Sequence, residues 1–188
     1  MKKTALNSGA NLIFKSVFKE VISWAAWIVA AVVLALIVNN TLIVNAQVIS
    51  GSMETTIMTG DKVLGNRLAY VFGEPERLDV IVFRWPDDRG ALPFVKRIIG
   101  LPGETVEIKN GLVYINGSTK PLDEKGYLHE NMYGSFGPYT VPEDSYFVMG
   151  DNRNNSNDSR DWKIKYVPKE DILGKVLLCF FPNIRPIN

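Results

Sequence analysis

The chain has 188 residues, with 21 Lys and Arg against 20 Asp and Glu, and 46% of its residues are hydrophobic. This composition excludes a disordered chain, which needs low hydrophobicity and high net charge, and a net charge of +1 gives no sign of nucleic-acid binding. One Cys and one His exclude an intramolecular disulfide framework, a multi-cysteine zinc site and a His-rich metal cluster. These counts exclude much metal and redox chemistry, and our expectation is a protein with no metal, no cofactor and no nucleic-acid partner.

The N-terminal part of the chain consists of a basic leader followed by a long uncharged run. Residues 1–20 carry four Lys against one Glu, and no further charge appears until Glu54. Residues 21–38 are apolar apart from one Ser, and at ~1.5 Å per residue a helix of this length spans about 27 Å, close to the hydrocarbon thickness of a bilayer. Basic residues before a span favour a cytoplasmic N-terminus. We therefore predict a cytoplasmic leader over 1–20 and a single transmembrane anchor over 21–45.

Two other interpretations of this segment stay open. Val44-Asn45-Ala46 resembles the small-x-small site of a cleaved signal peptide, although the apolar run is longer than the usual ~7–15 residues. A buried core helix is a weaker alternative, because such a helix would rarely be apolar all round and follow a basic leader. With an anchor or a signal peptide, residues 46–188 form an extracytoplasmic domain.

Short runs rich in Val, Ile, Tyr and Phe dominate the chain from Gln47 onward, and Gly, Pro, Asn and Asp separate them. They predict strands at 79–83, 94–99, 105–108, 112–115, 146–149 and 175–180. The Asn110-Gly111 pair predicts a tight hairpin, and only 64–71 looks helical. We expect a mainly β fold, an antiparallel sheet or barrel-like domain without parallel strands, with a long surface excursion at about 117–142.

Three segments of this domain carry side chains suited to catalysis. Ser50-Gly51-Ser52-Met53 places two hydroxyls in a tight turn, as a nucleophile needs. Lys96 lies among apolar residues, where desolvation would lower its pKa towards neutrality, although an exposed lysine on a strand is the simpler interpretation. Residues 150–162 interleave two Arg with three Asp, which indicates either a rigid hydrogen-bonded network or an acidic cation-binding loop. His129, in the excursion, and Cys179, in an apolar strand, are expected to have no catalytic role.

Together these segments resemble the type I signal peptidases, membrane-bound serine proteases that remove signal peptides from exported proteins. The resemblance covers nearly the whole chain and rests on five blocks in the family's order: Ser50–Met53, Gly60–Val63, Arg77–Phe83, Val95–Gly103 and Gly150–Arg160. A single anchor and a modest excursion are similar to the shorter Gram-positive enzymes. The resemblance implies the signal peptidase fold, in which an N-terminal transmembrane anchor is followed by an antiparallel β catalytic domain of the kind expected above.

The resemblance also implies roles for single residues. Ser52 matches the nucleophile and Lys96 the general base, while the Ser50 hydroxyl and the Ser52 backbone N–H match the oxyanion hole. Ser156 matches the residue whose hydroxyl orients the lysine amine. Asp158 and Arg160 match a supporting salt bridge near the active site. The apolar residues around the dyad are expected to bind substrate: Val48, Ile49, Met53, Ile57, Phe94 and Val95.

The expected partners follow from the same resemblance. They are preprotein signal peptides with small residues at positions −1 and −3, bound as an added β-strand, and the lipid bilayer beside which the cut is made. The expected location is the cell membrane, with one span, a cytoplasmic N-terminus and the catalytic domain outside the cytoplasm.

The chain departs from the family pattern at three positions: Thr55 where Pro is usual, Asn154 where Asp is frequent and Lys163 where Gly is common. None of these is a dyad residue, so we expect an active enzyme. A catalytically inactive, membrane-anchored homologue with an assembly or interaction role is the alternative, but such a protein would be expected to lack Ser52 or Lys96. A self-cleaving repressor-type Ser/Lys protease would carry a DNA-binding domain where this chain has its apolar segment.

Overall fold

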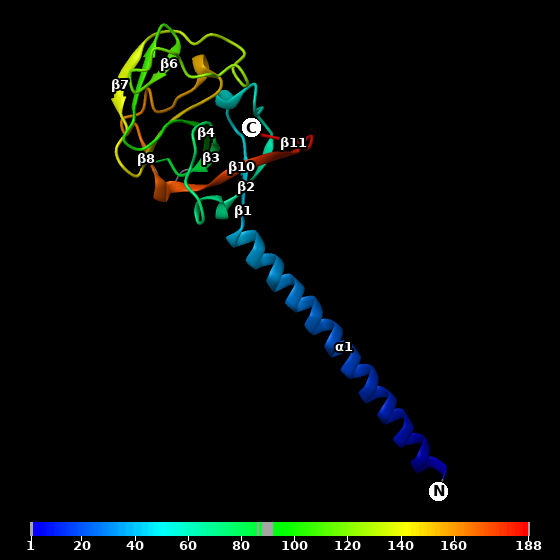
Figure 1. The fold of residues 1–188 in the computed structure, drawn as a ribbon. Coiled ribbons are helices and arrows are strands. Elements are labelled where there is room, and N and C mark those ends of the chain that lie inside the picture. The colour runs from blue at the N-terminus through cyan, green and yellow to red at the C-terminus, as the bar shows by residue number, and fades with distance from the viewer. Residues whose placement is uncertain (1, 86, 88–91, 188) are drawn as a thin grey trace. The chain divides into compact units, whose positions relative to one another are not determined.

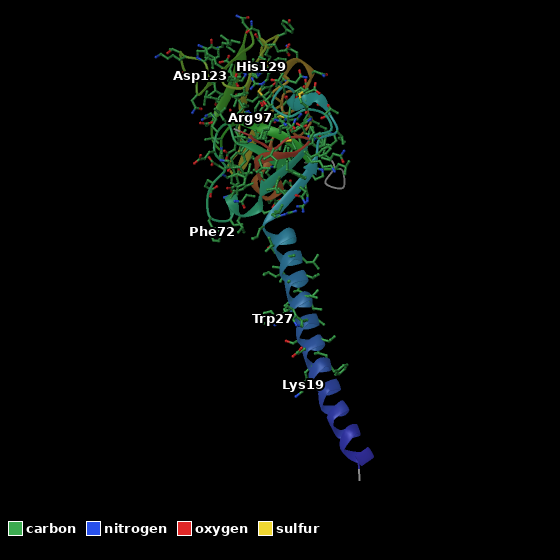
Figure 2. All side chains as sticks on the ribbon, turned by 90° about the vertical axis from the view of Figure 1, so that its right-hand side faces the viewer. Lys19, Trp27, Phe72, Arg97, Asp123 and His129 are labelled. Atoms are coloured by element: carbon green, nitrogen blue, oxygen red, sulfur yellow. The ribbon has the colours of Figure 1, made fainter. Side chains whose placement is uncertain are left out.

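The N-terminal part of the chain is one long helix, α1, at Lys2–Thr41. The computed structural model describes residues 2–85, 87 and 92–187, and in α1 it describes the side chains of 18–38 and Thr41. Residues 18–38 are long and apolar enough to cross a membrane by length and composition. Their large side chains are exposed along the helix, as Figure 2 shows for Trp27.

The helix ends earlier than the predicted anchor. Residues 43–45, which the sequence analysis assigned to the anchor, belong to strand β1 at Ile43–Gln47. β1 pairs in antiparallel register with strand β2 at Lys62–Asn66, and Val44 is buried in the core. Sheet hydrogen bonds and core packing therefore hold this segment, and the β unit begins at Leu42.

The β unit contains one large and one small sheet, in which every pairing between the described strands is antiparallel (Figure 1). The large sheet has the order β1-β2-β10-β3-β4-β8-β9, with β11 paired to β10. Its remaining strands are β3 at Val80–Phe83, β4 at Phe94–Gly100, β8 at Ser145–Met149, β9 at Val167–Pro168, β10 at Ile172–Phe181 and β11 at Arg185–Pro186. The prediction of a mainly β, antiparallel fold is confirmed.

The small sheet has the order β6-β5-β7 and comprises β5 at Thr105–Lys109, β6 at Leu112–Ile115 and β7 at Phe136–Thr140. Asn110 and Gly111 join β5 to β6 with φ of 50° and 80°, the positive values that a two-residue type I′ hairpin turn requires. The hairpin predicted from the Asn-Gly pair is confirmed. β7 lies inside the segment predicted as an excursion.

The helical prediction for 64–71 is wrong. Residues 64–66 complete strand β2, and a single 3-10 turn, η2 at Arg67–Tyr70, follows. The strand was missed because it contains Gly65, a residue with weak strand propensity. Close packing requires glycine at this position, since a Cβ there would lie 2.7 Å from Val44 Cγ1 and 2.8 Å from the carbonyl oxygen of Lys175. Two further single turns, η3 at Arg153–Asn155 and η4 at Lys169–Asp171, lie in loops.

Strand β4 positions the site. It is paired with β3 over Phe94–Arg97, whereas its pairing with β8 begins only at Arg97, opposite Met149. After Met149 the chain leaves the sheet as the loop 150–162. On the side of β8, the first residues of β4 therefore have no paired strand among the described residues, and their side chains are free to contact this loop. The loop returns to the core at Trp162, which packs edge-on against Phe94 with the ring centroids 6.2 Å apart.

Candidate active site

The Ser52 hydroxyl lies on a tight turn between β1 and β2. The turn is η1 at Gly51–Met53, and the Met53 side chain, buried in the core, anchors it. Asn152 joins the turn to the loop 150–162: its backbone N–H donates to the Ser52 carbonyl (3.1 Å), and its side-chain Nδ2 donates to the Gly51 carbonyl (2.9 Å). The hydroxyls of Ser50 and Ser52 lie 3.2 Å apart. The turn thus holds two neighbouring hydroxyls in a defined place.

Lys96 is buried in β4, with 1% of its surface exposed. The exposed alternative considered for it in the sequence is therefore wrong, because its amine points inward and donates to Ser156 Oγ at 3.1 Å. Burial lowers the pKa of Lys96 from 10.5 to about 8, against the opposing charge of Asp158 and with a smaller lowering contribution from Arg160. A large part of the Lys96 amine is accordingly neutral near pH 8.

A chain of hydrogen bonds leads away from the amine. Ser156 Oγ donates to Asp158 Oδ2 at 2.7 Å, and the Gly150 backbone N–H donates to the same oxygen at 3.0 Å. Arg160 forms a bidentate pair with Asp158, with both contacts at 2.8 Å. Burial alone would raise the pKa of Asp158, but the hydrogen bonds and charge of Arg160 hold it below its usual value. Asp158 is therefore ionised and fixes the Ser156 hydroxyl that faces Lys96.

One cavity joins these groups. Ser50, Ser52, Lys96 and Ser156 line a hollow of about 570 Å³ together with asparagines of the loop. A second, more apolar hollow of about 320 Å³ adjoins it, because both include Ser50, Ser52 and Phe94. The structure therefore brings the predicted dyad residues, Ser50 and Ser156 to one place.

The second hollow lies between two chain segments, 47–50 and 92–95. Its lining includes five of the six predicted substrate-binding residues: Val48, Ile49, Met53, Phe94 and Val95. The sixth, Ile57, is fully buried in the core cluster around Met53 and does not line this hollow. Its backbone N–H donates to the Met53 carbonyl (2.8 Å), and its side chain belongs to the same core cluster as that of Met53.

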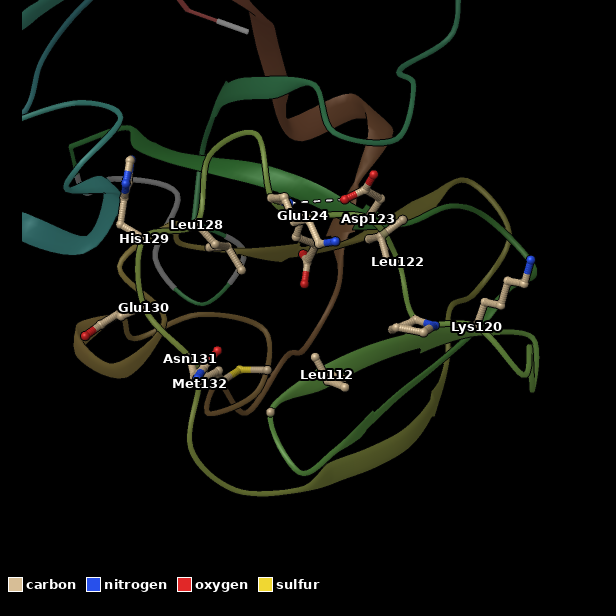
Figure 3. A pocket seen from close by; sticks show the side chains of 13 residues that line it. Leu112, Lys120, Leu122, Asp123, Glu124, Leu128, His129, Glu130, Asn131 and Met132 are labelled. Atoms are coloured by element: carbon tan, nitrogen blue, oxygen red, sulfur yellow. Dashed lines mark hydrogen bonds between the residues drawn. The ribbon is translucent and has the colours of Figure 1, made fainter.

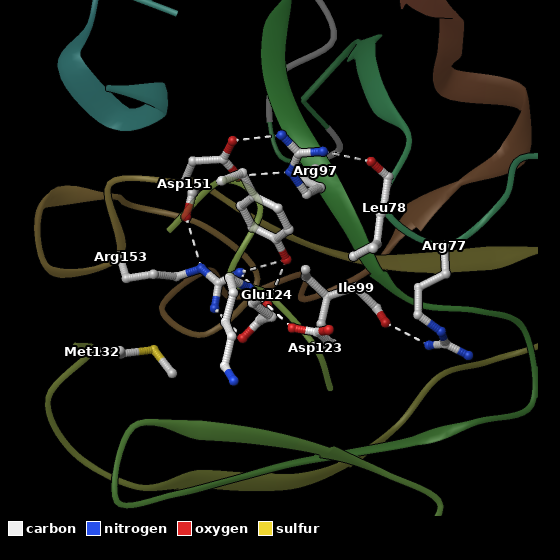
Figure 4. A network of polar contacts seen from close by, with 12 residues as sticks. Arg77, Leu78, Arg97, Ile99, Asp123, Glu124, Met132, Asp151 and Arg153 are labelled. Carbon is white, nitrogen blue, oxygen red and sulfur yellow. Dashed lines mark hydrogen bonds and ion pairs between the residues drawn. The ribbon is translucent and has the colours of Figure 1, made fainter. Parts of the chain in front are cut away.

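A buried ion pair that was not predicted from the sequence lies beside the dyad. Arg97 donates to both carboxylate oxygens of Asp151, at 2.9 Å and 2.7 Å, and both side chains are inaccessible to solvent (Figure 4). Thr56 Oγ1 donates to the same carboxylate at 2.5 Å. The pair thus connects β4, the loop 150–162 and the segment after the nucleophile. Two adjacent cations in an apolar strand were the available signal, since one side chain must face each side of the sheet.

A second buried ion pair connects the loop to the excursion. Arg153 donates to both oxygens of Glu124, at 3.1 Å and 2.5 Å. Glu124 also borders a hollow of about 660 Å³ (Figure 3). His129 lines that hollow and not the cavity of Ser52 and Lys96, and Cys179 is buried in the core as expected.

Two of the three departures lie in or beside the loop. Asn154 Nδ2 donates to the Asn131 carbonyl at 3.0 Å, and its Oδ1 accepts from the Tyr133 N–H at 2.9 Å. An aspartate would keep the second bond and lose the first. Lys163 is exposed after the buried Trp162, and nothing in the structure explains it. Thr55 follows Glu54, whose carboxylate accepts from Thr59 Oγ1 at 2.9 Å.

Comparison with known proteins finds a family model and relatives that match most of the chain. The signal peptidase, peptidase S26 family matches residues 21–181. Signal peptidase I S of Bacillus subtilis (strain 168) is 41% identical over 175 residues, which cover 87% of this chain and 91% of that protein. A probable signal peptidase I-2 of Synechocystis sp. is 41% identical over 158 residues, 82% of this chain and 70% of that protein.

Among solved structures, a crystal structure of a signal peptidase I from Enterococcus faecalis V583 is 37% identical in sequence. It aligns with a TM-score of 0.45 and covers 55% of this chain and 97% of that one. The family match covers most of the chain, and both relatives exceed one third identity over more than four fifths of it. The chain therefore belongs to the signal peptidase family, peptidase S26, and is a hydrolase of the serine-protease class.

Proposed function

We propose that this protein removes N-terminal signal peptides from exported preproteins as a membrane-anchored endopeptidase, with Ser52 as nucleophile and Lys96 as general base. The observation that carries the proposal is the environment of Lys96. Its buried amine lines the same cavity as the Ser52 hydroxyl, and its pKa is lowered to about 8. A neutral amine at the working pH is what proton abstraction from serine requires.

The reaction follows from these positions. The neutral Lys96 amine accepts the Ser52 proton while Oγ bonds to the scissile carbonyl carbon, whose π electrons move to the oxygen. The Ser52 N–H and the Ser50 hydroxyl donate to that oxyanion. The Lys96 ammonium then passes the proton to the leaving amine as the C–N bond breaks, and a water molecule activated by Lys96 hydrolyses the acyl-enzyme. Ser156, fixed by Asp158, orients the amine throughout.

The hollow between 47–50 and 92–95 is the proposed substrate groove. An extended segment between these two chain stretches would add a strand beside them and bind mainly through its backbone. Side chains at −1 and −3 of an extended substrate point to the same side. The limited apolar space beside Ser50 and Ser52 then favours small residues at both positions.

Substrate preference gives a direct test of the groove. Replacing Ala by Leu at −1 or −3 of a preprotein is expected to lower kcat/KM by at least tenfold, because each added side chain must fit the same limited hollow. The same change at −2 is the matched control and should alter kcat/KM less than threefold, since that side chain points away. Equal losses at −2 and −3 in cleavage assays would contradict the groove.

The pH dependence of cleavage tests the role of Lys96. Because the base must be neutral, log kcat/KM should rise by about one unit per pH unit below a midpoint near 8 and level off above it. Initial rates of preprotein cleavage by the full chain in detergent between pH 6 and 10 measure this curve. A curve that is flat over this range, or that already levels off by pH 6.5, is incompatible with Lys96 as the base.

The membrane arrangement is part of the proposal. The apolar helix crosses the bilayer with the basic leader in the cytoplasm, and the catalytic unit lies outside. Ile49 and Leu92, 68% and 67% exposed at the substrate hollow, are suited to contact lipid. Protease protection in oriented vesicles decides the topology: the leader, and not the catalytic unit, should be cleaved from the cytoplasmic side. The alternative of an inactive homologue is disfavoured because Ser52 and Lys96 are both present and share one cavity.

A further inference from the structure

The excursion reaches back to the loop 150–162 through a segment that we call the clamp, residues 122–133. Within it, Glu124 accepts two hydrogen bonds from Arg153, and both side chains are buried. Arg153 Nε in turn donates to the Gly150 carbonyl at 3.1 Å. Since the Gly150 N–H donates to Asp158, the same residue links the Glu124–Arg153 pair to the carboxylate that orients Ser156.

Tyr127 of the clamp lies between strand β4, which carries Lys96, and the loop 150–162, which carries Ser156. Its hydroxyl donates to Glu124 Oε1 at 2.7 Å. Its ring lies 4.0 Å from the Arg97 guanidinium carbon and 5.9 Å from that of Arg153. Arg97 follows Lys96 in β4, and Arg153 belongs to the loop that carries Ser156. Tyr127 is thus packed between the strand of the lysine and the loop of its hydrogen-bond partner.

The clamp also contacts the far end of the loop. Arg160, the partner of Asp158, donates to Met132 Sδ at 3.2 Å, and Tyr133 N donates to Asn154 at 2.9 Å. The clamp therefore contacts the loop at the adjacent residues Arg153 and Asn154 and again near its end at Arg160. These contacts tie the clamp to the loop that carries Ser156, the hydrogen-bond partner of the Lys96 amine.

We infer that Glu124 and Tyr127 are positioning residues of the peptidase reaction, which act through Arg153 and Gly150 on the Ser156–Lys96 pair. This inference rests on the proposed role of Lys96 as the base. It assigns to the excursion a task in the reaction, although no excursion side chain lines the cavity of Ser52 and Lys96 in the described chain.

Tyr127→Leu tests the inference without changing a charge. The charged groups that act on Lys96, namely Asp158, Asp151 and Arg160, all remain. A loosened loop would admit water to the amine and misplace it, so kcat is expected to fall at least tenfold with KM within twofold. Because less burial raises a lysine pKa, the midpoint of the pH–rate curve should move to higher pH by at least half a unit. Full chain in detergent and a signal-peptide substrate are used.

Conservative variants separate positioning from folding. Tyr127→Phe keeps the ring and should retain kcat within threefold of the wild-type value. In Glu124→Gln, kcat should fall at least tenfold. Glu124→Asp keeps the charge, so its kcat should lie between those of Glu124→Gln and the wild type. Glu104→Gln is the matched control, because Glu104 pairs with Arg77 in a similar bidentate way away from the loop. The variant is expected to be less stable, yet its kcat and pH midpoint should equal those of the wild type.

Each outcome decides the question. A folded Tyr127→Leu protein with wild-type kcat and midpoint overturns the inference, and so does an equal loss of kcat in Glu104→Gln. If Tyr127→Leu does not fold, Glu124→Gln with unchanged kcat overturns it instead. Lys96→Met separates this failure from failure of the proposed function: cleavage by Lys96→Met would overturn the proposed base itself, whatever the clamp variants do.

Discussion

Replacing Lys96 by Met is expected to abolish preprotein cleavage and at the same time to stabilise the folded domain. Met has nearly the length of Lys and fills the same buried space, but it cannot accept the Ser52 proton. Loss of a general base typically costs 10²–10⁴-fold, and we expect about 10⁴-fold here. Burial of Lys96 lowers its pKa to about 8, which at pH 7 destabilises the folded state by on the order of 3 kcal/mol.

The size of the stability effect changes with pH in a defined way. The folded-state pKa of Lys96 lies below its ordinary value of 10.5, so the destabilisation is fully present below pH 8 and disappears as pH rises towards 10.5. Urea unfolding should therefore show a large advantage of Lys96→Met at pH 7 and a small one at pH 10.5. Ser52→Ala should also be inactive but show no such pH-dependent gain.

Lys62→Met is the matched control for this experiment. Lys62 is exposed at the start of β2, so its replacement should leave cleavage unchanged and shift the free energy of unfolding by less than about 0.5 kcal/mol. If Lys96→Met cleaved the preprotein at the wild-type rate, or were less stable than the wild type at pH 7, the assignment of Lys96 as a desolvated base would be wrong.

Gly150→Ala is expected to disable the enzyme although residue 150 carries no side chain that reacts. A Cβ there would lie 2.3 Å from both the Ser52 carbonyl oxygen and Ser156 Oγ. One of the two segments must therefore move, and misplacement of this size near a reacting group lowers kcat by about 10²-fold. Overpacking should also lower the free energy of unfolding by roughly 1–3 kcal/mol.

Gly126→Ala provides the comparison. Gly126 lies in the clamp, but a Cβ there meets nothing within 4 Å and the side chains of Glu124 and Tyr127 remain, so the same chemical change should leave kcat and stability close to those of the wild type. Kinetics of preprotein cleavage and thermal unfolding of the two variants measure the difference. Similar kcat values for Gly150→Ala and Gly126→Ala would show that the close approach of the nucleophile turn and the loop does not matter to catalysis.

Much of the fold was readable from local patterns. Five of the six predicted strands match β3 to β6 and β8 to within a residue or two, and the sixth lies inside β10. Alternating β-branched and aromatic residues encode such strands locally. The Asn110-Gly111 turn was predicted for the same reason, because positive φ at two successive residues limits the choice of amino acids. Strands β1 and β2 were missed because one continues an apolar run and the other contains a glycine.

The candidate site divides in the same way. The sequence by itself determined that the chain carries an apolar N-terminal span, antiparallel strands, and a serine turn and lysine suited to serine-protease chemistry without a well-placed histidine. Only the tertiary structure decided that Lys96 is buried, that Ile57 belongs to the core, and that Glu124 pairs with Arg153. The physical reason is sequence separation. Ser52 contacts Asn152, and Lys96 contacts Ser156. Whether a lysine is an exposed charge or a buried base therefore depends on segments, dozens of residues away in the sequence, that pack against it.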